Sequence, residues 1–427
     1  MKRIFPIFMI LLLCATAQAQ QSFLDVTAPG NRQLQLAITT AKNLSGQQSP
    51  ETEKVICDVL QFDMTLAGPF SVRTVPGKGD GGGIRPGEFD LAPWKSAGVD
   101  LLVKSGYSLS GGSITLECRL YDVMKKKELT AKRYTGNIRD LRKIVHTFAD
   151  EIMRGVTGEK GPFTGKVAYV SKRGGNKEIY LMDYDGHNAQ QLTRNGSINL
   201  NPEFSPDGRE LVYTSYKRGN PDLFRRELFS GTEAAISARR GLNITGAFAP
   251  DGKKIALAQS REGSSNIYLI DKSGRQMARL TSSSAIDVSP AWSPDGSRIA
   301  FVSDRMGKPQ VFIMNADGSN VRRLTANGAY NVGPRWSPKG DRIVYCRQEG
   351  NGFQIYGIDP DGSNDTRLTS DGSNEHPRWS PDGRFITFSS KRGGKEGIFV
   401  MRADGSGQTR VSQGSSEDSH PTWSTRW

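Results

Sequence analysis

From residue 166 onward the chain alternates short β-rich runs with signals for tight turns. In the unit that begins at Trp292, a Ser-Pro-Asp-Gly turn leads into the alternating run 298–303, and a polar loop leads into a second run, 310–314. Asp317 and Gly318 form a strong hairpin signal before a third run, 321–325. Together with the residues before Trp292, these runs predict a four-stranded antiparallel sheet.

The aromatic residue before each such turn recurs about every 44 residues, which is the length that one propeller blade needs. The copies begin at Phe204, Phe248, Trp292, Trp336 and Trp379, and a clipped copy begins at Trp423. Runs 166–170, 178–182 and 190–193 predict a blade that lacks its first strand, whereas 419–423 predicts a first strand with no blade after it. Joining the two closes the ring and pairs the sheet edges. The sequence therefore predicts a six-bladed β-propeller over residues 166–427.

Residues 20–157 lack this period and predict a separate α/β domain. Ser49 and Pro50 are an N-cap and a first-turn proline, and the helix after them carries Val55, Ile56, Val59, Leu60 and Met64 on one face. A second long helix is predicted over 138–156 and a short one over 91–97. Strands are expected at 23–26, 33–38, 70–75, 100–109, 113–121 and 129–134. With 158–165 as a hinge, the predicted fold class is a small N-terminal α/β domain followed by a six-bladed β-propeller closed by a C-terminal strand.

Residues 1–19 are predicted to be a secretory signal peptide. Lys2 and Arg3 precede an apolar run, 4–15, that is short for a membrane span, and Ala17 and Ala19 form a small-x-small cleavage site. Cys14 follows Leu13, where a lipoprotein signal would carry a small residue, so cleavage after Ala19 is favoured over lipid attachment. We therefore expect an exported protein of the periplasm without a membrane span.

The formal net charge of +13 loses two positive charges with the signal peptide. The basic residues are scattered over the repeats, which favours an ordinary solvated surface, and the exported compartment excludes nucleic acid as a partner. Anionic lipid, peptidoglycan and an acidic protein surface stay open. Cys57 and Cys118 could pair in an oxidising compartment, whereas Cys346 is expected to be a buried thiol.

The sequence offers little catalytic chemistry. It has no Gly-x-Ser-x-Gly elbow, and the glycine-rich run 79–83 lacks the Lys-Ser/Thr ending of a phosphate loop. His146 and His187 have no partner at catalytic spacing in the sequence. The prediction is a protein that is not an enzyme and has no cofactor.

His376 and His420 are the one pair that suggests a metal. They occupy the same place in neighbouring blades, with Glu375, Glu417 and Asp418 nearby, and two imidazoles with carboxylates can bind a transition metal. The equivalent positions elsewhere carry Asn201, Thr245, Ser289 and Gly333. The favoured interpretation is therefore that both histidines stabilise the turn or contact a protein, and a metal-dependent lyase or hydrolase acting on an anionic polysaccharide is the alternative.

One face of the propeller is predicted to bind a protein. The connections from fourth to first strands and from second to third strands converge there around the central channel, and loops on a rigid scaffold carry function. The residues predicted to contact a partner are Asn201, Asn243, Asp287, Tyr330, Asn331, Asn374, Glu375, His376 and His420 from the first set of connections, and Arg173 and Arg305 from the second.

These features together resemble the TolB family of the periplasmic Tol-Pal envelope system. The resemblance rests on the signal peptide, the small α/β domain, the junction Thr157–Phe163 and the Pro-x-Trp-Ser-Pro-Asp-Gly units that close near Trp423, and it covers the whole mature chain. The segment Ala92–Asp100 resembles the family's approach to its central strand. The turn words alone are shared with propeller peptidases and lyases.

The resemblance implies a non-enzymatic, monomeric adaptor. In the family, the channel-mouth face receives the peptidoglycan-associated lipoprotein Pal, and the first mature residues, here Gln20 to about Asn31, bind the C-terminal domain of TolA. Other outer-membrane proteins are further candidate partners. The placement of that N-terminal segment reports on Pal occupancy, and the system supports outer-membrane integrity and constriction during cell division. Leu242 and Thr245 do not match a Pal-contact pattern, so fold and class transfer better than individual contacts.

Overall fold

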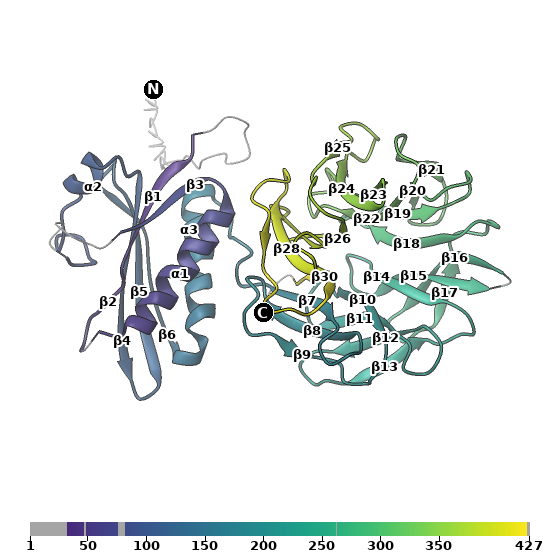
Figure 1. Cartoon of the computed structure of the whole chain (residues 1–427), viewed down its shortest axis with the longest axis horizontal. Coiled ribbons are helices and arrows are strands. Elements are labelled where there is room, and N and C mark those ends of the chain that lie inside the picture. The colour runs from purple at the N-terminus through teal and green to yellow at the C-terminus, as the bar shows by residue number, and fades with distance from the viewer. Residues whose placement is uncertain (1–31, 47, 76–81, 262, 425–427) are drawn as a thin grey trace, which may run out of the picture.

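The chain forms two bodies that lie side by side, an α/β domain and a β-propeller (Figure 1). The computed structural model describes residues 32–46, 48–75, 82–261 and 263–424. The predicted signal peptide, the predicted strand at 23–26 and the segment Gln20–Asn31 lie outside the described residues.

The N-terminal domain is one mixed sheet with two long helices against it. The sheet order is β3-β1-β4-β5-β6, with β2 beside β4; β1 runs parallel to β3 and β4, while β4, β5 and β6 are antiparallel. Figure 1 shows α1 and α3 between this sheet and the propeller. The elements are β1 Leu34–Thr39, β2 Lys42–Asn43, α1 Pro50–Ala67, β3 Phe70–Val75, α2 Ala92–Ser96, β4 Leu101–Ser110, β5 Ser113–Asp122, β6 Lys127–Asn137, the 3-10 helix η1 Ile138–Asp140 and α3 Leu141–Thr157.

Local chemistry sets the ends of the helices. The Ser49 hydroxyl accepts the backbone N–H of Thr52, so α1 begins with its expected cap, and Pro50 occupies the first turn. Gly158 ends α3 in the left-handed region at φ +81°, where a side chain would be strained. The apolar face predicted for α1 is the buried one, since Ile56, Val59 and Met64 are fully buried.

The propeller consists of six sheets of four strands each, as the repeat predicts. The blades are β10 Asn199–Phe204, β11 Glu210–Ser215, β12 Asp222–Glu227 and β13 Glu233–Ser237; β14 Asn243–Phe248, β15 Lys254–Arg261, β16 Ser264–Asp271 and β17 Gln276–Arg279; β18 Asp287–Trp292, β19 Arg298–Ser303, β20 Gln310–Asn315 and β21 Arg322–Arg323; β22 Asn331–Trp336, β23 Ile343–Glu349, β24 Gly352–Ile358 and β25 Thr366–Arg367; β26 Asn374–Trp379, β27 Phe385–Ser390, β28 Gly397–Arg402 and β29 Thr409–Arg410; and β30 Asp418–Trp423, β7 Lys166–Ser171, β8 Glu178–Asp183 and β9 Gln190–Gln191.

The ring closes as predicted, because the strand nearest the C-terminus completes the first blade. β30 pairs antiparallel with β7, and Trp423 stands opposite Val167. Beyond the last pair, the Ser424 backbone N–H donates to the Lys166 carbonyl at 2.8 Å. Closure leaves neither end of the propeller as an open sheet edge.

Each Ser-Pro-Asp-Gly word folds as a self-contained turn. In the copy after Trp292, the Ser293 hydroxyl donates to Asp295 Oδ1 at 2.5 Å and accepts the Arg298 backbone N–H at 2.9 Å. Gly296 adopts a φ of +70°, which glycine accepts without strain. These hydrogen bonds of the turn therefore all lie within residues 293–298.

Two strand predictions differ from the structure in length. β6 runs over Lys127–Asn137, past both ends of the predicted 129–134, because it pairs with β5 along its whole length. The outermost strands are shorter than predicted, and β21 spans only two residues. The backbone pairing ends there because the Thr325 hydroxyl, in place of a backbone carbonyl, accepts the Val311 N–H at 3.1 Å.

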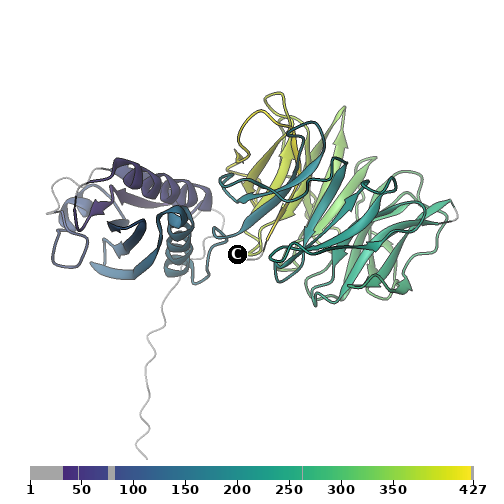
Figure 2. The same ribbon diagram turned by 90° about the horizontal axis from the view of Figure 1, so that it is seen from below.

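The two domains share a continuous apolar core. Phe148 of α3, Phe163 of the linker and Tyr184, Phe385 and Trp423 of the propeller belong to one buried cluster. The Tyr184 ring stacks on Trp423 with centroids 5.5 Å apart. Figure 2 agrees with Figure 1 in placing the N-terminal domain beside one edge of the ring.

Candidate functional site: the loop face of the propeller

The propeller has two unlike faces. We call the face with the fourth-to-first and second-to-third connections the loop face, and the face with the Ser-Pro-Asp-Gly turns and the third-to-fourth hairpins the hairpin face. The N-terminal domain docks on the hairpin face, where Arg384 donates to Glu159 Oε2 at 2.8 Å and to the Thr157 hydroxyl at 3.1 Å. The loop face therefore lies away from these contacts.

Four exposed apolar side chains occupy one equivalent position on the loop face. Ile198, Leu242, Ile286 and Tyr330 precede the first strands of consecutive blades and are 45%, 36%, 53% and 37% exposed. The remaining two blades carry Ser373 and Glu417 at this position. We call these four side chains the apolar arc. Monomeric surfaces rarely repeat exposed apolar groups in this way, so the arc is suited to protein binding.

The backbone of the arc is fixed. The carbonyls of Ile198, Leu242 and Tyr330 accept backbone N–H groups at 2.9, 3.0 and 2.9 Å. The donors lie at or just beyond the ends of the second strands. The Tyr330 ring also packs edge-on against Phe353 at 5.9 Å. The arc thus presents side chains from a rigid base, which limits the entropy lost when a partner binds. Met306, 63% exposed in a second-to-third connection, adds a further apolar group to this face.

Four of the predicted contact residues are buried, which corrects the expectation that they touch a partner directly. Asn243, Asp287, Asn331 and Asn374 have no exposed surface. Each begins a first strand, and its side chain faces into the blade. Asn331 Nδ2, for example, donates to the Asn327 carbonyl at 2.8 Å and to Gln310 Oε1 at 2.6 Å.

The predicted arginine Arg305 serves the same scaffold. Its guanidinium binds both oxygens of Asp287 at 3.1 Å and lies over the Phe301 and Phe312 rings. Arg392 repeats the arrangement by donating to Asn374 Oδ1 at 3.0 Å. These pairs clamp the connections on which the apolar arc stands. The predicted Arg173 is half-buried and donates to the Gln413 carbonyl at 3.4 Å.

The third residue of every first strand is in the left-handed backbone region. Asn201, Thr245, Ser289, His376 and His420 have φ between +50° and +57°, and the sixth position is Gly333. A register shift follows each one, so every inner strand carries a bulge at the channel. The predicted residues Asn201, His376 and His420 are partly exposed there, as is Glu375 beside His376.

The two histidines stack in the channel with ring centroids 3.6 Å apart. His376 Nδ1 lies 3.1 Å from the Ser389 hydroxyl, and His420 Nδ1 lies 3.0 Å from the Ser419 hydroxyl. Burial lowers the pKa of His420 to about 3, and burial with His420 and Arg378 lowers the pKa of His376 well below its ordinary value. Within the described residues, no group of three or more His, Cys, Asp or Glu side chains is placed to hold a metal ion.

The three described cysteines are free thiols. Cys57 on α1 and Cys118 on β5 are unpaired, so the disulfide that the sequence left open does not form in this structure. Burial raises the pKa of the Cys118 thiol above its ordinary value. Cys346 is a buried thiol on β23, as expected.

A buried polar network joins the two domains, and no local sequence pattern indicates it. His146 of α3 lies 2.8 Å from Asp63 of α1 through Nδ1 and 3.2 Å from Asp185 of the propeller through Nε2. Tyr184 donates to Asp63, and Arg142 donates to Asp185. Burial alone would lower the pKa of His146, but the two carboxylates raise it to about 10.

We expect His146 to stay protonated at neutral pH. Because its pKa rises from 6.5 to about 10, its pairing stabilises the fold fully below pH 6.5, and this contribution is lost as the pH rises towards 10. An NMR titration of the imidazole would show no transition near pH 6.5, and the stability difference between the parent and His146→Gln would shrink above that pH. His187→Gln is the control in the neighbouring hairpin. An ordinary titration midpoint at His146 would contradict the assignment.

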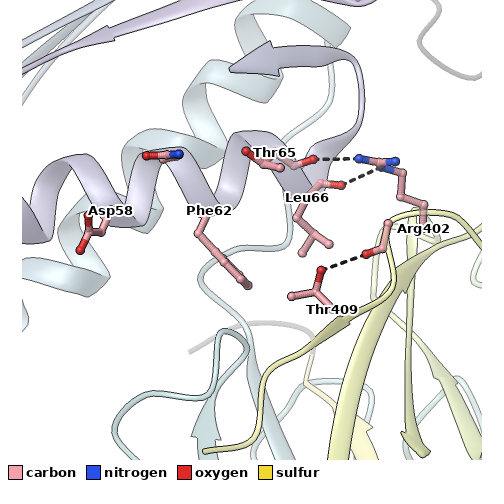
Figure 3. A pocket seen from close by; sticks show the side chains of 8 residues that line it. Asp58, Phe62, Thr65, Leu66, Arg402 and Thr409 are labelled. Carbon is pink, nitrogen blue, oxygen red and sulfur yellow. Dashed lines mark hydrogen bonds between the residues drawn. The ribbon is translucent and has the colours of Figure 1, made fainter. Parts of the chain in front are cut away.

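A second contact closes the end of α1 (Figure 3). The Arg402 guanidinium of β28 donates to the Leu66 carbonyl at 3.0 Å and to the Thr65 carbonyl at 2.8 Å. The last turn of α1 has no basic residue of its own, so the propeller supplies the cation that the helix end favours. Phe62, Arg402 and Thr409 help to line a cavity of about 390 Å³ between the domains.

Comparisons with known proteins match both domains. The model of the TolB amino-terminal domain matches residues 23–129, and that of the TolB beta propeller domain matches residues 153–427. The chain belongs to the TolB family. Its relatives include the Tol-Pal system protein TolB of Geobacter sulfurreducens, 65% identical over 213 residues, and that of Geobacter metallireducens, 63% identical over 203 residues.

These matches to the TolB proteins of the two Geobacter species cover 49% and 48% of this chain, and they span about half of each relative's length (49% and 47%). The fold agrees over a longer stretch with the crystal structure of TolB from Acinetobacter baumannii. That structure has a TM-score of 0.81 and 25% identity, and the match covers 92% of this chain and 97% of the other. No helix in the described part of the chain is long and apolar enough to cross a membrane.

Proposed function

We propose that this protein is a non-enzymatic periplasmic adaptor of the Tol-Pal system that binds Pal through the loop face. The apolar arc carries the proposal, since Ile198, Leu242, Ile286 and Tyr330 form a rigid, exposed apolar surface on a face away from the N-terminal domain. Their neighbours Ser373 and Glu417 make the rest of the rim polar, which suits an interface with an apolar centre and a polar edge. Membership of the TolB family supports the same partner class.

The predicted contact residues divide into two roles within this proposal. Six residues, Asn201, Tyr330, Glu375, His376, His420 and the half-buried Arg173, are exposed or partly exposed and are proposed to touch Pal. The buried Asn243, Asp287, Asn331 and Asn374, with Arg305, hold the connections beneath the arc. We further propose that the segment Gln20–Asn31 binds the C-terminal domain of TolA and that the complex supports envelope constriction.

Calorimetric titration of residues 20–427 with the Pal and TolA domains tests this function. We expect both to bind, and we expect a chain that starts at residue 32 to lose TolA and keep Pal. A mature chain that fails to bind the Pal domain would refute the adaptor assignment. The alternative, a metal-dependent lyase or hydrolase, instead requires stoichiometric metal that is lost on replacing His376 and His420 by alanine.

A further inference from the structure

The central channel widens into a cavity of about 230 Å³ near the hairpin face. Four tryptophans that end inner strands line it, namely Trp292, Trp336, Trp379 and Trp423, together with Glu203, Arg335 and Arg378. Its wall is therefore aromatic, with three charged side chains among the rings.

The charges in this cavity do not balance. Arg378 Nε donates to Glu203 Oε2 at 3.1 Å, a pair that links β26 to β10 on either side of β30. Arg335 pairs with no carboxylate within the described residues: its Nη1 donates to the Pro334 carbonyl at 2.7 Å, and its Nε is buried without an acceptor. The cavity thus holds one positive charge more than it neutralises, and an unpaired cation that is partly buried is costly.

The surroundings add to this positive potential. Burial and the neighbouring Arg378 lower the pKa of Arg335 to about 9, which still leaves the guanidinium charged at neutral pH. The positive charges of Lys177 and Arg378 also disfavour protonation of the stacked histidines, since both help to lower the pKa of His420. Three cations, Arg335, Arg378 and Lys177, thus act on this part of the channel, against one carboxylate among the residues that line the cavity, Glu203.

The neutral groups of the cavity also lack acceptors. Trp379 Nε1 donates to the Arg335 carbonyl at 3.2 Å, whereas the indole N–H groups of Trp292, Trp336 and Trp423 are buried and have no partner among the described residues. Buried donors normally find a partner. A ligand with oxygen acceptors would satisfy the unpaired guanidinium nitrogen of Arg335.

We propose that this cavity binds a small oxyanion, a carboxylate or a phosphate, on the guanidinium of Arg335. The planar guanidinium fork matches either group, and a single negative charge would balance the cavity. Glu203 stays paired with Arg378, and its negative charge repels a ligand that carries more than one negative charge. The site is built from the hairpin-face end of the channel, so it does not depend on what binds the loop face.

The indole N–H resonances of the full mature chain report on this site. Benzoate is titrated at constant ionic strength, with benzamide as its uncharged counterpart and inorganic phosphate as a second oxyanion. We expect benzoate or phosphate to shift the resonances of Trp292, Trp336 and Trp423 and to leave Trp94 of the other domain unchanged. The two arms show which oxyanion the cavity prefers.

Two variants test the role of the charges. Arg335→Gln should weaken binding by about tenfold or more, which corresponds to losing one charge-assisted hydrogen bond. Glu203→Gln removes the competing carboxylate and should tighten binding, a gain that misfolding cannot produce. Arg240→Gln, an exposed arginine in a connection of the loop face, is the matched control. Equal shifts with benzamide, no shift with either anion, or unchanged affinity in Arg335→Gln would overturn the proposal.

Discussion

Replacing Ile286 by aspartate and Tyr330 by alanine is expected to weaken binding of the Pal domain by at least about 100-fold. The two side chains are neighbouring members of the apolar arc, 53% and 37% exposed. Their backbone is held before Pal arrives, because the Ile286 N–H donates to Asp304 Oδ1 and the Tyr330 carbonyl accepts the Gln348 N–H. A charge at position 286 would be buried unpaired against an apolar partner, and loss of the Tyr330 ring would remove an aromatic anchor. Calorimetry on the double variant and the two single variants measures the loss.

The matched control is Phe229→Asp. Phe229 is more exposed than either arc residue, at 69%, but it lies in the hairpin between β12 and β13 on the other face. We expect this variant to bind Pal like the parent. Parental affinity in the Ile286→Asp chain, with an unchanged thermal midpoint, would rule out the loop face as the Pal surface.

Trp423→Ala is expected to lower the free energy of unfolding by about 3–5 kcal/mol. Trp423 is 6% exposed in the strand that closes the ring, and its indole also stacks on Tyr184 and Phe385 beneath the N-terminal domain. The substitution therefore leaves a cavity where the indole contributes both to ring closure and to the docking of the N-terminal domain. Denaturant unfolding followed by circular dichroism gives the loss, and we expect the two domains to unfold in separate transitions.

Trp336→Ala separates these two effects. Trp336 is equally buried, at 7%, but its cluster contains only residues of β18–β25. It should lose a similar free energy while the N-terminal domain stays docked, whereas the exposed Phe229→Ala should change stability by less than about 0.5 kcal/mol. A Trp423→Ala chain as stable as Phe229→Ala would show that this residue does not hold the ring.

The propeller could be predicted from the sequence because its signals are local. Ser293, Asp295 and Gly296 complete a turn within a few residues, and the same chemistry after Phe204 and Trp379 makes the period visible. Closure by 419–423 followed from counting strands, and Ser49 and Pro50 marked the start of α1 for an equally local reason. Hydrogen bonds between residues that are close in the sequence can be predicted from the sequence pattern.

The candidate site was harder to predict because polar character in a sequence does not distinguish an exposed position from a buried one that is hydrogen-bonded. Asn243, Asn331 and Asn374 recur at one position in different blades, and the repetition itself indicates a scaffold role that every blade needs. The position before them varies in character from isoleucine and tyrosine to glutamate, which is the pattern of a recognition surface. The difference between these two positions across the repeats is the sequence signal that separates the two roles.

The link between the domains had no sequence signal at all. His146 meets Asp63, 83 residues earlier, and Asp185 in another domain, so no spacing rule connects the three. Arg402 completes the end of α1 from 336 residues away for the same reason. Hydrogen bonds of this kind form only after separate elements have folded and packed together, so only the three-dimensional structure shows them.

The third residue of each first strand lines the central channel, but its side chain does not determine the fold of the blade. In each blade the bulge already imposes the unusual backbone angle, whether the position carries asparagine, threonine, serine, glycine or histidine. Substitutions at these six positions can therefore alter the width and polarity of the channel while the strand pairing stays intact. The same six-bladed scaffold could thus bind different ligands in its channel after substitutions at these six positions.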